Sequence, residues 1–258
     1  MDLGLKDKKV LITGGSKGIG LACARSFIAE GAKVALVSRS EDNLKKAKDA
    51  VKGVYTIAAD LTDAAAAAAM VERVEKEFGA IDVLVNSAGA AKRTDADDLT
   101  PAAWRAGMDA KYFSYINVID PVIKKMGKRG QGAVINVIGS GGKVASPTHL
   151  AGGAANAALL LATAGLAYAY ASKGVRVVGV SPGVTKTERV AQGLKAEAKR
   201  ANVSVEQAEK QMVARLPMGR PAEPEEIADI VVFAASERGR YLTGANISTD
   251  GAASHVVV

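Results

Sequence analysis

Short apolar runs rich in β-branched residues alternate with helix-type stretches along this chain, and this alternation constrains the fold more than any other feature. The runs are 8–15, 33–39, 54–60, 81–89, 132–139, 175–183 and 245–251. Most of them are apolar at successive positions, which is typical of strands buried on both faces of a parallel sheet. The pattern therefore predicts a Rossmann-like, doubly wound α/β fold with about seven strands and helices on both faces.

No repeat or linker interrupts this alternation, and a chain of 258 residues is near the upper size of one hydrophobic core. We therefore expect a single dinucleotide-binding domain over residues 1–258. One segment, 185–224, is polar and helical in pattern and lies between the last two predicted strands. Such an excursion commonly forms a lid over a pocket, and the alternative is a surface helical hairpin without a function.

Composition excludes several other classes of protein. No apolar run approaches the 18 residues that cross a bilayer, so no membrane segment is predicted, and the charged start is unlike a secretory signal. The lone Cys23 excludes an internal disulfide and fits the cytoplasm. The net charge of +7 is spread among acids and aromatic residues make up only 4%, so we expect no nucleic-acid partner. No metal site is predicted.

The segment "TGGSKGIG" follows the first predicted strand and opens a helix. Gly14, Gly18 and Gly20 allow a tight turn and a close approach of the backbone to a pyrophosphate, which the free N–H groups of the helix then bind. The residues between these glycines are expected to share the contact: Ser16, Lys17 and Ile19. The alternative is a glycine turn that binds no ligand.

The ends of the second and third predicted strands indicate which dinucleotide is bound. Ser38 stands where an NAD-binding chain would place an acid, and Arg39 and Lys17 add positive charge nearby. Cations without an acid favour a 2′-phosphate, so we expect NADP(H) in preference to NAD(H), although Arg39 also fits an ordinary surface position. Asp60, followed by Leu61, ends the third strand and is a candidate acceptor for the adenine amino group.

The fourth and sixth predicted strands end in "NSAG" and "SPGVTKT". With "TGGSKGIG", Asp60, "VINV" and the closing "GRPAEPEEIADIVVFAASERGRYLTGANISTDGA", these motifs make nearly the whole chain resemble the short-chain dehydrogenase/reductase family. The resemblance implies oxidoreduction of an alcohol or carbonyl in a small-molecule substrate. It implies two further sets of cofactor contacts. These are Asn86, Ala88 and Gly89 at the adenosine ribose, and Pro182, Gly183, Val184 and Thr187 at the nicotinamide.

The chain departs from this family where the chemistry is done. Members of the family use Asn, Ser, Tyr and Lys side chains, and ungapped matching puts Lys111, Gly139, Gly152 and Asn156 in those places. Sliding the central frame by one gives Gly153, Ala157 and Ser140, which restores only the serine. None of the six tyrosines is followed by a lysine at the fourth position. The usual acid–base dyad is therefore absent.

Three other side chains are candidate substitutes. His149 can transfer a proton near neutral pH, Lys111 can place positive charge near an oxyanion, and Ser140 can donate a hydrogen bond. Each also has an ordinary alternative: a solvated loop histidine, a structural lysine and a turn serine.

Two functions remain open at this point. One is an NADP(H)-dependent oxidoreductase with a remodelled site, and the other is a catalytically inactive nucleotide sensor, scaffold or pseudo-enzyme subunit. Cations in the 185–224 segment leave room for an anionic or thioester-linked substrate, or simply form a solvated helix face. The helix at 157–171 is apolar almost all round. In the family the corresponding helix packs against its own copy, so we expect a homodimer or homotetramer.

Overall fold

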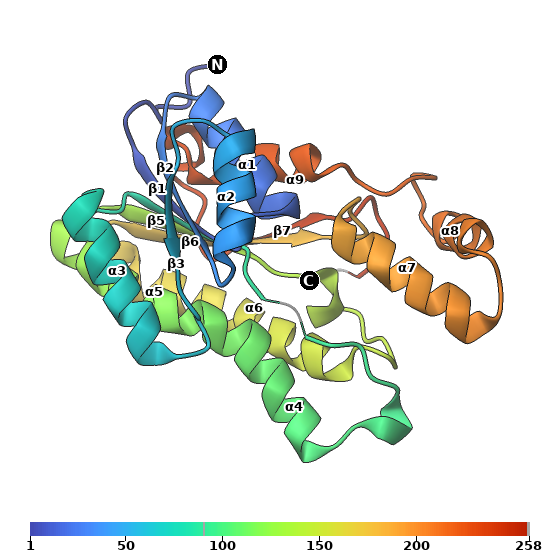
Figure 1. The fold of residues 1–258 in the computed structure, drawn as a ribbon. Coiled ribbons are helices and arrows are strands. Elements are labelled where there is room, and N and C mark those ends of the chain that lie inside the picture. Colours follow the sequence, from blue (N-terminus) through green and yellow to red (C-terminus); the bar gives the residue numbers. More distant parts are fainter. Residues whose placement is uncertain (90, 257–258) are drawn as a thin grey trace.

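The computed structural model describes residues 1–89 and 91–256. Seven parallel strands form one sheet in the order β3-β2-β1-β4-β5-β6-β7 (Figure 1). They are β1 (Lys9–Thr13), β2 (Lys33–Ser38), β3 (Tyr55–Ala58), β4 (Val83–Asn86), β5 (Gly132–Val137), β6 (Val175–Pro182) and β7 (Asn246–Thr249). The strand order reverses between β1 and β4, where open α/β sheets bind ligands. The predicted doubly wound fold is confirmed.

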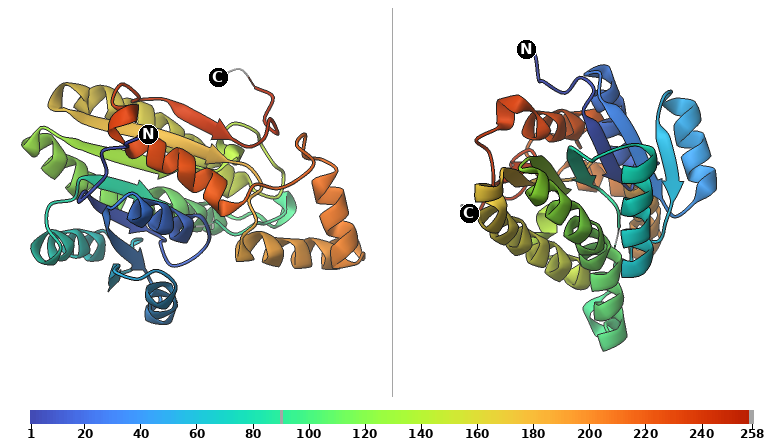
Figure 2. Two further views of the ribbon diagram at one scale, coloured as in Figure 1. Left: turned by 90° about the horizontal axis from the view of Figure 1, so that it is seen from above. Right: turned by 90° about the vertical axis from the view of Figure 1, so that its left-hand side faces the viewer.

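Helices cover both faces of the sheet (Figure 2). One face carries α1 (Gly18–Ala29), α2 (Glu41–Ala50) and α9 (Pro224–Ala235). The other carries α3 (Ala64–Glu77), α5 (Ser114–Arg129) and α6 (Leu150–Tyr170). α4 (Pro101–Met108) runs into α5 through a π-helical turn, Asp109–Phe113. Short 3₁₀ turns are Ala96–Asp98, Ser140–Gly142, Ala171–Lys173 and Glu237–Gly239.

The strands are buried on both faces because consecutive side chains point to opposite sides of a sheet. In β1, Val10 and Ile12 pack in the core beneath α1 and α9, while Leu11 packs in the core beneath α3 and α5. All three side chains are fully buried. This explains why the strands read as uninterrupted apolar runs rather than as an alternation of polar and apolar residues.

Segment 185–224 holds α7 (Glu188–Ala201) and α8 (Val205–Val213), which project to one side of the sheet in Figure 1. The segment leaves and returns at one point, where Thr185 pairs with Ala222 in an isolated parallel bridge. Its first helix contacts the rest of the chain through two exposed ion pairs, Lys17–Glu188 at 2.9 Å and Arg200–Asp95 at 3.0 Å. Its role as a lid remains a prediction.

Helix α6 has a property that was not expected from the sequence. Leu150–Lys173 is long and apolar enough to cross a membrane by length and composition, with a mean hydropathy of 1.6. Helices in the cores of globular folds pass the same test, and the inner face of α6 packs against β6 through residues such as Leu159 and Ala167. Its outer face is different, because Leu161 and Tyr168 are 77% and 92% exposed.

Candidate active site

The glycine turn between β1 and α1 forms a cradle in which side chains do not fit. Gly14 has a φ of +64°, and a Cβ built on it would lie 2.7 Å from Cα of Ala88. A Cβ on Gly20 would lie 2.5 Å from the carbonyl oxygen of Gly14. The residue before the helix, Lys17, makes no side-chain capping bond to the first turn of α1. The free N–H groups of that turn therefore suit a pyrophosphate, so the residues present fit a dinucleotide.

A cavity of about 300 Å³ lies beside this turn, at the carboxyl ends of β1 to β4. Seven of the residues predicted from the sequence to bind the cofactor line it: Gly14, Ser38, Arg39, Asp60, Leu61, Ala88 and Gly89. The loop after β4 approaches the π-helical turn so closely that a Cβ on Gly89 would lie 2.0 Å from the carbonyl oxygen of Ala110. Residues from four strands thus converge on one pocket.

The polar groups of this cavity are partly oriented by one another. The Ser16 hydroxyl donates to Oγ of Ser38 at 3.1 Å. Hydrogen bonds from the backbone N–H and the hydroxyl of Thr62, at 3.0 and 2.8 Å, hold the pKa of Asp60 below its ordinary value, and the charge of Arg39 adds to this effect. Asp60 is thus a charged acceptor beside a cation.

Among the predicted cofactor residues that do not line this cavity, three have side chains engaged by other parts of the protein. The Lys17 ammonium donates to Glu188 of α7, so it is drawn toward segment 185–224 and not toward Arg39. Ile19 packs against the hydrophobic core beneath α1. The third is Asn86, whose side chain is engaged inside the sheet.

The Asn86 side chain is fully buried in a hydrogen-bonded chain that crosses the sheet. Its Oδ1 accepts from the Thr13 hydroxyl at 3.3 Å, and its Nδ2 donates to Oδ1 of Asn136 at 3.0 Å. Asn136 in turn donates to the Thr163 hydroxyl of α6 at 3.0 Å. This side chain is therefore not available to a ribose. It connects β1, β4, β5 and α6 instead, as a satisfied buried network.

The loop after β6 approaches the glycine turn from the other side. Gly183 follows Pro182 and packs so closely on Asp250 that a Cβ would lie 2.9 Å from Cα of that residue. Val184 accepts a backbone hydrogen bond from Ala222. Thr187 caps α7, and its methyl group would lie 3.1 Å from a Cβ on Gly18.

Three of the four positions predicted to replace the family's catalytic residues, Gly139, Gly152 and Asn156, take part in two close side-chain contacts. His149 is the N-cap residue of α6, and its imidazole lies over Gly152. A Cβ built on Gly152 would lie 2.1 Å from Cε1 and 2.4 Å from Nε2 of the imidazole. The histidine ring therefore occupies the space in which any side chain at position 152 would begin.

A second close contact involves Gly139 and Asn156. Asn156 is 4% exposed, and its Nδ2 would lie 3.1 Å from a Cβ on Gly139. Its Oδ1 has no hydrogen-bond partner among the described residues. A serine at position 139 would be crowded by this amide. Neighbouring Ser140 begins a 3₁₀ turn, in which its carbonyl accepts from the N–H groups of Lys143 and Val144.

Lys111 lies in the π-helical turn, a feature often found at functional sites. Its Nζ donates to the Tyr115 hydroxyl at 2.6 Å and to the carbonyl of Val137 at 3.1 Å. Burial, with a smaller effect of Arg189, lowers the pKa of Lys111 to about 7. Tyr115 is fully buried and donates to the same carbonyl at 2.7 Å, and burial raises its pKa. Sequence reasoning did not single out Tyr115, although Lys-x-x-x-Tyr spacing places both side chains on one helix face.

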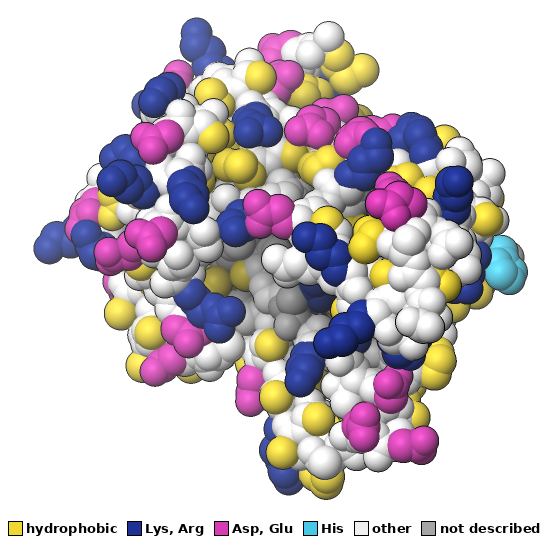
Figure 3. Space-filling view, turned by 45° about the vertical axis from the view of Figure 1, so that its right-hand side comes forward, with side chains coloured by type: hydrophobic (Ala, Val, Ile, Leu, Met, Phe, Trp, Pro, Cys, Tyr) yellow, Lys and Arg dark blue, Asp and Glu magenta, His cyan; other side chains and the backbone are white. Residues whose placement is uncertain are grey.

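Positive charge surrounds His149. Burial lowers the pKa of this imidazole, and the charges of Arg93, Arg189 and Lys111 lower it further. Its Nδ1 is buried without a hydrogen-bond partner in the described part of the chain. Figure 3 views the molecule from the side nearer α7 and shows a hollow with Lys and Arg side chains around it. Arg93 was missed from the sequence because it lies in a loop without a motif.

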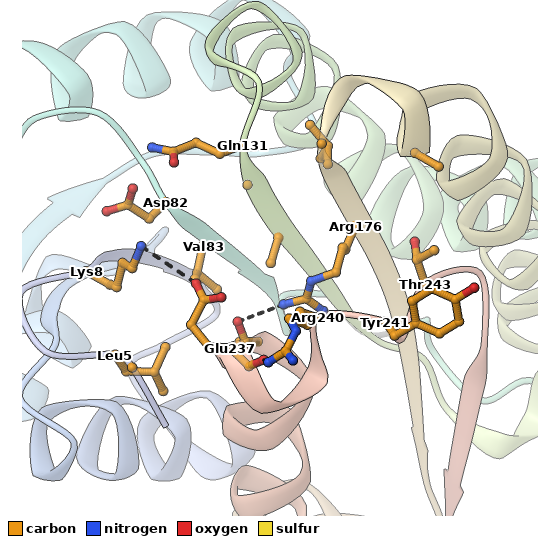
Figure 4. A pocket seen from close by; sticks show the side chains of 17 residues that line it. Leu5, Lys8, Asp82, Val83, Gln131, Arg176, Glu237, Arg240, Tyr241 and Thr243 are labelled. Carbon is orange, nitrogen blue, oxygen red and sulfur yellow. Dashed lines mark hydrogen bonds and ion pairs between the residues drawn. The ribbon is translucent and has the colours of Figure 1, made fainter. Parts of the chain in front are cut away.

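A larger cavity, about 720 Å³, lies at the opposite, amino-terminal edge of the sheet (Figure 4). None of the predicted site residues lines it. Its charged groups are engaged with the protein itself: Lys8 approaches Glu237 at 4.0 Å, and Arg176 donates to the carbonyls of Ala234 and Ala235. Across residues 1–89 and 91–256, no group of three potential metal ligands comes together.

Comparison with known proteins gives matches over nearly the full length. The family model described as enoyl-(acyl carrier protein) reductase matches residues 14–253. A 3α-hydroxysteroid dehydrogenase of Mediterraneibacter gnavus is 32% identical over 255 residues, covering 96% of this chain and 98% of the relative. An acetoacetyl-CoA reductase of Shinella zoogloeoides is 34% identical over 241 residues, covering 93% and 96%. Among solved structures, L-sorbose reductase of Gluconobacter frateurii, complexed with NADPH and L-sorbose, superposes with a TM-score of 0.92 at 29% identity and covers 100% of both chains.

Proposed function

Because this chain is an oxidoreductase of the short-chain dehydrogenase/reductase family, we propose that it transfers hydride between NADP(H) and a small alcohol or carbonyl compound, with His149 as the proton-transferring group. One observation carries the proposal. The imidazole of His149 occupies the space beside Gly152 that the side chain of the family's tyrosine would need. His149, the N-cap residue of α6, is therefore our candidate for the acid–base function.

The cofactor part of the proposal is supported by the cavity at β1 to β4. The nicotinamide, when bound, supplies or accepts the hydride. The glycine turn and the first turn of α1 would bind the pyrophosphate. Ser38 leaves room for a 2′-phosphate, and Arg39, which lines the same cavity, would neutralise it. Because Lys17 is engaged by Glu188, we assign the preference for NADP(H) to Arg39 in particular.

His149 would handle the proton in both directions. Since its pKa lies below the ordinary value, the imidazole is neutral at neutral pH and can accept the proton of an alcohol during oxidation. At lower pH the imidazolium can donate a proton to the developing alkoxide during reduction. Ser140, next to Gly139, is the candidate donor to the substrate oxygen, and Lys111 adds positive charge to this region.

The test compares His149→Ala with the wild type in steady-state assays of NADPH oxidation and NADP⁺ reduction across carbonyl and alcohol panels. Removing a positioned acid–base group is expected to lower kcat by about 10²–10⁴ and to leave the Kd for NADPH unchanged. His255→Ala is the matched control, because His255 is the second of the two histidines and lies exposed near the end of the chain.

Three outcomes separate the alternatives. If the wild type binds NADPH but turns over no substrate of either panel, the catalytically inactive alternative is correct. If it binds neither NADPH nor NADH, the cofactor proposal is wrong. If NADH binds as tightly as NADPH, the assignment to Arg39 is wrong, while the oxidoreductase proposal stands.

A further inference from the structure

We propose that Arg93 and Arg189 form an anion subsite beside His149, so that the substrate carries a carboxylate or a phosphate-type group next to its reacting carbon. This inference rests on the proposed function and deepens it, because it names the chemical class of the substrate.

Arg93 is positioned by the segment that leads into α6. Its Nη1 donates to the hydroxyl of Thr148 at 3.3 Å, and the N–H of Thr94 donates to the carbonyl of Thr148 at 3.1 Å. Thr148 directly precedes His149. The loop after β4 and the start of α6 are therefore joined beside the imidazole, and the guanidinium of Arg93 is held there.

Arg189 comes from a different segment, because it is the second residue of α7. Part of its side chain is exposed, but the guanidinium is crowded enough that desolvation lowers its pKa, and the charge of Arg93 lowers it further. Arg189 also lowers the pKa of His149 and of Lys111. Basic groups from four separate segments thus lie close enough to act on one another's charge, and no carboxylate is among the charges that act on His149.

A neighbouring arginine shows that this arrangement differs from an ordinary charged helix face. Arg200 lies eleven residues after Arg189, which is close to three helical turns, so both lie on the same face of α7. Arg200 pairs with Asp95 at 3.0 Å and with Glu197 at 2.9 Å. Arg189 and Arg93 take part in none of the ion pairs formed by the described residues.

Cations that face one another repel, and the repulsion is relieved when an anion binds between them. Two guanidinium groups suit a carboxylate or a phosphate, because their planar N–H forks can bind two oxygens at once. Arg93 and Arg189 are both exposed residues, so such a group can reach them from solvent. The negative charge that would neutralise Arg93 and Arg189 is therefore supplied by the ligand.

Anion binding at this subsite also affects proton transfer. Arg93 from the loop after β4, Lys111 from the π-helical turn and Arg189 from α7 all disfavour the charged imidazole. A bound anion offsets this field, so His149 becomes easier to protonate when the substrate arrives. Binding of an anionic substrate thus favours the protonated imidazole of His149. The imidazolium can then donate the proton that the reduction of an oxo acid requires.

The first experiment compares kcat/KM for NADPH-dependent reduction of 2-, 3- and 4-oxo carboxylates with the values for their methyl esters. The wild type is expected to prefer the best carboxylate over its ester by about tenfold or more. Arg93→Gln and Arg189→Gln should each reduce this preference, and the double variant should abolish it. Arg189→Lys keeps the charge but loses the fork, so its preference should be intermediate. Lys195→Gln is the matched control, because it removes the same charge from an exposed position on α7.

The second experiment measures binding without turnover, by the shift in Tm that succinate or inorganic phosphate causes in the NADP⁺-loaded protein. A shift in the wild type and in Lys195→Gln that is lost in the double variant supports the subsite, even if no carbonyl is reduced and the proposed function fails. Equal use of acids and esters by an active enzyme overturns the subsite and leaves the proposed function intact. If the enzyme is inactive, an absent or unchanged Tm shift overturns the subsite as well.

Discussion

At the scale of single residues, two close contacts occur at the positions predicted to replace the family's catalytic residues. His149 fills the volume that a side chain at position 152 would need, and the amide of Asn156 would lie 3.1 Å from a Cβ at position 139. A tyrosine therefore cannot be restored at position 152 while the imidazole is present, and a serine at 139 would crowd the amide of Asn156. We interpret this packing as a site rebuilt around other polar groups, because a merely degraded site would more simply leave a cavity.

The position of the His149 imidazole over Gly152 predicts that Gly152→Ala disables the enzyme without removing any functional group. An added Cβ at 2.1 Å from Cε1 must displace the imidazole, so kcat is expected to fall by about 10² or more, as in His149→Ala, at unchanged affinity for NADPH. Gly165→Ala in the same helix is the control, because its Cβ would meet no atom within 4 Å. Full activity of Gly152→Ala in the assay of NADPH oxidation would rule out His149 as the proton-transferring group.

The sequence identified these residues as candidates, but it did not predict which of their side chains contact one another. Position counting found Gly152, Asn156 and Gly139, since helices and strands keep fixed spacings. It could not reveal that His149 points back over Gly152, because the direction of a loop side chain is decided by tertiary packing. Arg93 had no local signal for the same reason. Asn86 matched a motif, yet its side chain is used inside the sheet.

At the scale of elements, the π-helical turn Asp109–Phe113 sets the chemistry of Lys111. It places the ammonium against the Tyr115 hydroxyl and the carbonyl of Val137, in a partly buried position where the charge of Arg189 also acts on it. A charged lysine in such a place is unfavourable for folding, because desolvation is not offset by an acid. Positions that lower stability in this way are expected where function requires them.

The desolvation of the Lys111 ammonium in this turn predicts that Lys111→Met stabilises the fold at low pH. The pKa of Lys111 in the folded protein, about 7, lies below its ordinary 10.5, so the folded state disfavours the proton. The penalty is complete below pH 7 and disappears as the pH rises toward 10.5. Lys111→Met should therefore raise the free energy of unfolding at pH 6 by about 2 to 4 kcal/mol, and by much less at pH 9.5.

Urea denaturation at pH 6 and pH 9.5 measures this difference. Tyr115 keeps its hydrogen bond to Val137 in the variant, so no buried hydroxyl loses its acceptor. Lys45→Met, on the exposed side of α2, is the control and should leave the pH dependence unchanged. If Lys111→Met is destabilising to the same extent at both pH values, the ammonium supports the fold and the argument from burial is wrong.

At the scale of the whole molecule, the sheet and its helices follow from the apolar pattern, because the requirement to bury both faces leaves few arrangements. The pattern could not separate the two faces of α6, since nearly every residue of that helix is apolar. The structure separates them. The outer face exposes Ala154, Ala157, Leu161, Ala164 and Tyr168, which are spaced three and four residues apart, without a single charge. An apolar stripe of this length on a protein surface indicates an interface.

We expect a second copy of the chain to cover this stripe, because small residues at helical spacing allow two identical helices to pack closely about a twofold axis. Leu161→Glu and Tyr168→Glu place charge in the stripe, and each should shift the mass measured by light scattering at micromolar concentration from a dimer or tetramer to a single chain. Met218→Glu is the control, because Met218 is 63% exposed and lies outside α6. A wild type that is already a single chain, or a Leu161→Glu variant that keeps the full assembly, would show that the exposed face of α6 is not the contact.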